Sequence, residues 1–172
     1  MKLNQILLVT WLSGVGSLAL ADPPQPPKNV NVEPTTPKSA ALTSRAASAE
    51  MSGDPQAALK LAERAIATNP RDPWGHYDKA MALTRIGQLD RALGSFWDAE
   101  QRYSAADRWG KSVAIYGRAH ALSEAGRCDE ARKAFRAYVS LIREQDLKSA
   151  NMAVKYAADC RSPIEPPVAA HR

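Results

Sequence analysis

The stretch "RIGQLDRALGSF" at residues 85–96 carries the spacing that decides the fold. Gly87 is followed five positions later by Ala92 and nine positions later by Phe96. The stretch "EAGRCDEARKAF" at residues 124–135 has glycine, alanine and phenylalanine at the same three places. Small and apolar residues at such intervals lie on one face of a helix, and a glycine suits the left-handed turn that ends the preceding helix. The sequence therefore predicts two helices joined by a tight turn, in a unit that recurs.

A third copy of the pattern, "MSGDPQAALKLA", stands at residues 51–62, with Ala62 in the place of the phenylalanine. The three glycines, at positions 53, 87 and 126, are separated by 34 and then 39 residues. Seven positions before each glycine stands a further alanine: Ala46, Ala80 and Ala119. Helical units that recur at this period indicate an array in which each unit buries its apolar face against the next.

This pattern resembles the tetratricopeptide repeat, a helix–turn–helix unit of about 34 residues. The resemblance covers roughly Ser39 to Arg143 and gives three repeats. It implies an all-α fold: a right-handed superhelical array of antiparallel helix pairs, a TPR-like solenoid, in which small residues let the two helices of a pair approach closely. It also implies a concave groove lined by the first helix of each repeat.

The chain departs from the family pattern in several places. The family's tryptophan is replaced by Leu42, His76 and Ile115 in the three repeats. Its terminal proline is replaced by Ser104 in the second repeat and by Arg143 in the third. Five extra residues fall between the second and third repeats. We assign them to a longer second helix that runs to about Tyr103 and to a turn, "SAAD", whose last residue, Asp107, is expected to cap the next helix.

Aspartates mark several expected helix starts. Asp54 and Asp72 each precede a proline, which pairs a side-chain acceptor with a residue suited to the first helical turn. Asp146 is expected to cap a last helix over 146–160, which the following "RSPIEPP" ends. This capping helix would cover the apolar face that the final repeat otherwise exposes.

The first residues have the layout of a secretory signal peptide. Lys2 precedes an apolar stretch from Ile6 to Leu20, and a small-x-small site ends at Ala21. The apolar stretch is shorter than the roughly 20 residues of a membrane span. We therefore expect cleavage after Ala21 and a periplasmic or secreted protein, with an uncleaved anchor as the alternative. The expected organisation is a signal peptide at 1–21, a disordered Pro-rich linker at 22–38, a helical domain at 39–162 and a disordered tail at 163–172.

Charge and motifs exclude some functions. The 172 residues carry a formal net charge of +5, but basic residues alternate with acidic ones, as in "RDPWGHYDK", so we interpret them as a solvated exterior and not as a nucleic-acid footprint. His76, His120 and His171 lack the spacing of metal ligands, and we favour packing or surface roles for them. No phosphate loop or serine-nucleophile motif follows the expected cleavage site. We therefore expect no cofactor, no metal and no catalysis.

The resemblance places two groups of side chains in the groove, on the first helices of the second and third repeats. They are Trp74, Tyr77, Met81, Arg85, Tyr116 and His120. Aromatic residues, methionine and arginine are enriched where proteins bind partners. For the second repeat we expect the core on a different helix face from this stripe, and two interpretations stay open: a groove that binds a ligand, and packing of the rings that line it.

The chain contains two cysteines, Cys128 and Cys160. Cys128 is expected to begin the second helix of the last repeat, and Cys160 to end the capping helix. The midpoint of the two positions falls in the turn between these antiparallel helices, so both sulfurs should lie at the same end. An exported chain then favours a disulfide, with free thiols, or a metal or redox role, as alternatives.

These features predict an exported, non-enzymatic module that binds a protein or peptide in the cell envelope. A binder of the cell wall or of glycans is the second hypothesis, with Trp74, Trp109, Tyr77 and Tyr116 as stacking platforms, and an enzyme is the third. We expect no nucleic-acid partner and no stable membrane insertion after cleavage. The carboxylate clamp by which some family members bind chaperone tails is absent, because Thr43, Ala47, Val113 and Gly117 occupy its places.

Overall fold

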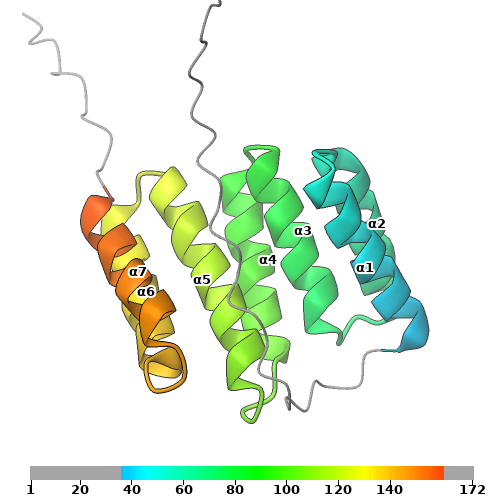
Figure 1. Ribbon diagram of the computed structural model, residues 1–172. Coiled ribbons are helices and arrows are strands. Elements are labelled where there is room, and N and C mark those ends of the chain that lie inside the picture. Colours follow the sequence, from blue (N-terminus) through cyan, green and yellow to red (C-terminus); the bar gives the residue numbers. More distant parts are fainter. Residues whose placement is uncertain (1–35, 161–172) are drawn as a thin grey trace, which may run out of the picture.

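The computed structural model describes residues 36–160, and each element in that part of the chain is an α-helix. The helices are α1 (Pro37–Met51), α2 (Pro55–Thr68), α3 (Pro73–Arg85), α4 (Leu89–Arg102), α5 (Arg108–Glu124), α6 (Cys128–Ile142) and α7 (Leu147–Asp159). Figure 1 shows them side by side in chain order, from α1 and α2 at one end to α6 and α7 at the other. The all-α prediction is confirmed. The expected signal peptide, most of the linker and the tail lie outside the described residues.

Helix packing follows the order of the chain. Each helix packs against the next one, and the first helices of successive pairs also contact one another, α1 with α3 and α3 with α5. Between residues 36 and 160, the second helices α2 and α4 contact only their chain neighbours. The first helices therefore form a common inner layer, as in a helical solenoid.

Polar side chains start the helices where the sequence predicts. Asp54, Asp72, Asp107 and Asp146 accept hydrogen bonds from the backbone N–H groups of Ala57, Trp74, Gly110 and Ser149, at 2.9, 3.1, 2.8 and 2.9 Å. Each bond satisfies a donor that the first turn of a helix leaves without a partner.

The first helix begins earlier than expected. Pro37 opens α1, and the Thr36 hydroxyl accepts a hydrogen bond from the Ser39 N–H at 3.2 Å. Proline is favoured at this position because its fixed φ suits the first turn and its missing N–H would have no helical partner. The last residues of the segment expected as a linker, 22–38, are therefore helical.

Glycines end the first helix of each pair. Gly53, Gly87 and Gly126 have φ angles of 78°, 82° and 70°, and no other residue between 36 and 160 has a positive φ. At the second of these turns, the N–H of Gln88 donates to the Leu83 carbonyl at 2.9 Å. Glycine adopts this left-handed conformation without the steric cost that a side chain carries, so the predicted turns are confirmed.

The extra residues between the second and third pairs form part of the packing. Helix α4 ends at Arg102, and Tyr103 then folds inward, where it is 5% exposed and packs among Ala99, Ala114 and Trp74. The Tyr103 ring lies so close to Gly110 that a Cβ there would collide with it. Because Gly110 on α5 has no side chain, the ring of Tyr103, which follows the end of α4, has room to pack there.

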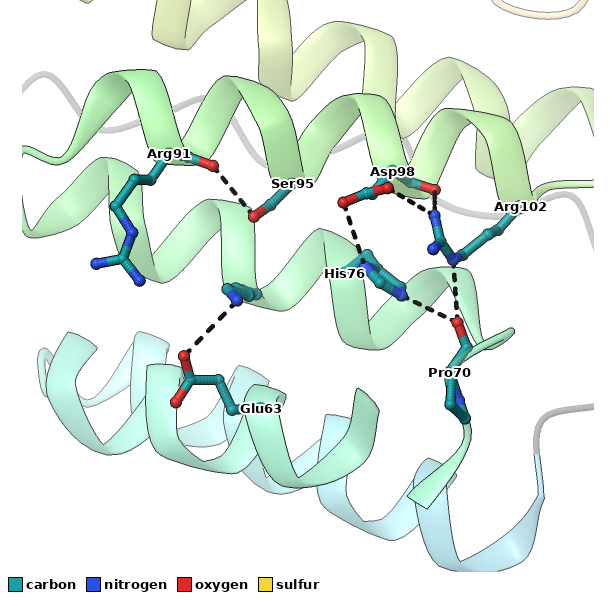
Figure 2. Close-up of polar contacts among 8 residues, drawn as sticks. Glu63, Pro70, His76, Arg91, Ser95, Asp98 and Arg102 are labelled. Atoms are coloured by element: carbon teal, nitrogen blue, oxygen red, sulfur yellow. Dashed lines mark hydrogen bonds and ion pairs between the residues drawn. The ribbon is translucent and has the colours of Figure 1, made fainter. Parts of the chain in front are cut away.

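A polar junction joins the α2–α3 turn to α4, as Figure 2 shows. The Pro70 carbonyl accepts hydrogen bonds from His76 Nε2 at 3.1 Å and from Arg102 Nε at 3.0 Å, and Arg102 also bonds Asp98 at 2.9 Å. Burial is the main reason why the pKa of His76 is lowered, so the ring is neutral at neutral pH and donates from Nε2. His76 therefore has a packing role, as predicted.

Candidate binding groove

The inner layer contains a cavity of about 290 Å³. Its walls include five residues that the sequence analysis assigned to the groove: Tyr77, Met81, Arg85, Tyr116 and His120. The sixth, Trp74, lines a neighbouring hollow, which Tyr77 also lines. The structure thus brings the residues of two repeats together, and α1 adds Glu50 and Met51 to the same cavity.

The aromatic residues serve both the core and the cavity wall. Tyr116 is 7% exposed, and its ring centroid lies 4.9 Å from that of Tyr138. Tyr77 meets Phe96 edge-on, with centroids 6.0 Å apart. Tyr116 therefore belongs to the core as well as to the cavity wall, and substituting this residue would disturb the fold as well as the groove.

The aromatic residues next to the cavity form a cluster. The Trp74 ring lies 5.7 Å from Tyr77, 5.7 Å from Tyr103 and 5.6 Å from Trp109, measured between centroids. Edge-on and tilted contacts of this kind contribute more stability to a cluster than the burial of its apolar area alone. Two of the proposed glycan platforms, Trp74 and Trp109, thus pack against each other.

Two acidic side chains and one basic side chain face the cavity. Arg85 Nε on α3 donates to Glu50 Oε1 on α1 at 3.0 Å. The other carboxylate oxygen of Glu50 and Oδ2 of Asp78 are buried and have no hydrogen-bond partner within residues 36–160. Burial raises the pKa of Asp78 well above its usual range, and the negative charges of Asp72 and Glu50 add to this effect.

Asp78 is not among the residues predicted for the groove. The prediction that the charges of "RDPWGHYDK" are solvated is wrong for Asp72, only 2% exposed as a helix cap, and for Asp78 in the cavity wall. A signal was present, because Asp78 follows Trp74 by four positions and precedes Met81 by three. Residues three and four apart lie on the same side of a helix.

His120 is a second titratable group of the cavity wall on α5, beside Tyr116. Its ring centroid lies 4.5 Å from Tyr116, 5.2 Å from Phe135 and 4.9 Å from Tyr156. Burial lowers the pKa of His120 to about 4, so the imidazole is neutral at neutral pH. Its Nε2 atom is buried without a hydrogen-bond partner in the described part of the chain.

The two histidines of the described chain have different surroundings. His76 bonds the α2–α3 turn, whereas His120 packs among rings of α5, α6 and α7. Across residues 36–160, no group of three or more histidine, cysteine, aspartate or glutamate side chains has a geometry that could hold a metal ion.

Cys128 and Cys160 form a candidate disulfide, with Cα atoms 5.5 Å apart. They join the start of α6 to the residue that follows α7. Arg132 reinforces the same end of the pair, because its guanidinium donates to the carbonyls of Ala157 at 3.2 Å and Cys160 at 3.1 Å. The sequence-based pairing agrees with this geometry.

The chain matches the model of a known family. The model of the family described as tetratricopeptide repeat matches residues 49–96, from the end of α1 into α4. The fold and this match fit a tetratricopeptide-type repeat protein. No curated protein matches the chain.

Tetratricopeptide repeats are typically non-catalytic interaction modules that present an extended concave surface. A protein partner is therefore the kind of ligand that the family match suggests. None of the helices between residues 36 and 160 has the length and apolar character needed to cross a membrane.

Proposed function

We propose that this tetratricopeptide-type protein is exported and binds a segment of a protein or peptide partner in the cell envelope through its inner layer. The observation that carries the proposal is the convergence of five groove residues, taken from two repeats, on one cavity. Concave helical layers of this kind bind extended segments of other chains. The signal-like residues 1–21 and the paired cysteines support the exported location.

Site-specific photo-crosslinking tests the groove without removing core rings. A benzophenone side chain at Met81, which lines the cavity, is expected to give a discrete adduct with a partner in cells. The matched control is the same group at Trp97, which is 57% exposed and outside the cavity. Equal adducts at both positions, or an adduct only at 97, would reject the groove as the binding surface.

Export has its own test, because a groove can bind a partner in any compartment. Cell fractionation followed by intact-mass measurement should find the protein in the envelope fraction with a mass that begins at Asp22. A full-length chain in the cytosol would reject export and leave the groove proposal to the crosslinking experiment.

A further inference from the structure

Two carboxylates from different helices meet at the wall of the cavity. Glu50 lies near the end of α1 and its side chain is 16% exposed. Asp78 lies in the middle of α3, and its Oδ2 has less than 1 Å² of exposed surface. Both line the 290 Å³ cavity, and each keeps one buried oxygen that lacks a hydrogen-bond partner in the described chain. A buried acceptor without a donor is unfavourable, so a ligand that supplies donors is stabilised there.

Acidic side chains outnumber basic ones in the cavity wall. Among residues 36–160, Arg85 is the only lysine or arginine that lines it, and Arg85 already pairs with Glu50 at 3.0 Å. His120 is neutral at neutral pH because burial lowers its pKa to about 4. No cationic side chain in the described chain pairs with Asp78, so the wall has one more acid than base.

The rest of the wall is mostly apolar and aromatic. Tyr77, Met81, Phe96 and Tyr116 surround the space beside the two carboxylates. Lysine and arginine combine a long apolar stem with a charged tip, and a cation gains further from contact with aromatic faces. The volume of 290 Å³ lies near the lower end of the range for small-molecule pockets, which suits a single long side chain.

We infer that the cavity is a specificity pocket for a lysine or arginine side chain of the partner polypeptide. The stem lies against the rings and Met81. The ammonium or guanidinium group pairs with the carboxylates of Asp78 and Glu50, whose buried oxygens turn toward the cavity to accept its hydrogen bonds. This inference rests on the proposed function, since it names the partner residue that the groove takes. An acidic side chain would meet two carboxylates and is excluded.

Blocked alanine pentapeptides test the chemistry without knowledge of the partner. Four peptides with lysine, arginine, norleucine or glutamate at the centre are titrated into the purified protein, and NMR shifts of Tyr77, Met81 and His120 are followed. Lysine or arginine peptides should give saturable shifts, whereas norleucine, which keeps an apolar stem without the charge, and glutamate should give none. Norleucine binding as tight as lysine binding would overturn the inference.

Conservative variants test the two carboxylates. Asp78→Asn and Glu50→Gln should each weaken lysine or arginine binding by about tenfold or more, because charge-assisted hydrogen bonds are lost. The matched control is Asp90→Asn, an acid 99% exposed outside the cavity, which should bind as the wild type does. Circular dichroism shows whether each variant is folded. If Asp78→Asn does not fold, the binding measurement on Glu50→Gln provides the test. Unchanged affinity in both folded variants would overturn the inference.

Other outcomes separate this inference from the proposed function. If no peptide binds but crosslinks at position 81 persist, the basic-residue inference fails and the groove proposal stands. If neither is seen, both fail. Shifts at Tyr77 and Met81 that depend on protein concentration alone would assign the cavity to a second copy of the chain and overturn the inference.

Discussion

Gly117 shows how a single missing methyl group shapes the inner layer. A Cβ at this position would collide with the ring of Phe96, which is 0% exposed. The backbone of α5 can therefore approach α4 closely, and both residues line the cavity. The position corresponds to one of the places of the family's carboxylate clamp, so the packing itself prevents a clamp side chain here.

We predict that Gly117→Ala lowers the free energy of unfolding by about 1–3 kcal/mol, the usual cost of adding a methyl group to a packed core. The matched control is Gly94→Ala in α4, where a Cβ would meet nothing within 4 Å. Alanine is the better helix former, so the control should gain about 0.5–1 kcal/mol. Urea unfolding of both variants measures the difference. A stable Gly117→Ala would show that Phe96 can move aside.

Protonation of His120 should destabilise the fold in acid. The unfolded chain takes up this proton near pH 6.5, whereas the folded chain does so only near pH 4. The stability that His120 contributes is thus fully present above pH 6.5 and is lost as the pH falls towards 4, by roughly 2–3 kcal/mol.

His120→Phe isolates this effect. The pKa of Asp78 is raised, so its protonation favours the folded state as the pH falls, but this contribution is present in both the wild type and the variant. The wild type should lose more stability than the variant between pH 7 and pH 4.5. NMR titration of the imidazole gives the direct value. A pKa near 6.5 in the folded protein would contradict the prediction.

How far individual residues can be predicted from sequence depends on the range of their interactions. The capping role of Asp54 follows from the next three residues, because a cap bonds its own helix. The burial of Asp78 depends on α1, which lies more than 25 residues away in the chain. The six predicted groove residues came from a family pattern that records such distant contacts. Asp78 is not part of that pattern.

At the scale of elements, α6 and α7 are the two helices joined by the candidate disulfide. The two cysteines lie 32 positions apart and link the start of α6 to the residue that follows α7. The face of α7 turned away from α6 has no further helix among the described residues, and Leu147 and Val154 are 59% and 57% exposed. The candidate disulfide therefore secures the helix with the fewest neighbours.

Replacing both cysteines by serine should lower the free energy of unfolding by roughly 3–4 kcal/mol in the chain-entropy account. Amide hydrogen exchange should quicken mostly in α7 and little in α3, because the link acts on the terminal pair. Mass spectrometry of protein from its native compartment should find the linked peptides of Cys128 and Cys160. Two thiols open to alkylation in that material would contradict the pairing.

At the scale of the whole molecule, stability depends on the contacts between neighbouring pairs. One of these is a largely buried ion pair between α4 and α5. Arg118 donates to both carboxylate oxygens of Glu100, with Nη2 at 3.2 Å from Oε2, and Glu100 is 4% exposed. An array of this kind unfolds cooperatively only while each interface is strong enough to couple its two sides.

Glu100→Gln should lower stability by about 2–3 kcal/mol, because it leaves the charge of Arg118 partly buried without its partner. It should also broaden the urea transition, as α1–α4 and α5–α7 begin to unfold separately. The matched control is Glu130→Gln, which removes an exposed ion pair with Arg127 and should change stability little. A sharp, unshifted transition for Glu100→Gln would show that the interface does not depend on this pair.

The predominance of contacts between adjacent helices also determines how the chain reaches its fold. Contacts between adjacent helices close short loops, and chains with such local contacts fold in about microseconds to milliseconds. The α6–α7 pair can therefore form before any oxidation, and folding brings the two sulfurs together. The reduced and oxidised chains should consequently refold at similar rates, while the reduced chain unfolds faster, so that the bond acts on the lifetime of the folded state.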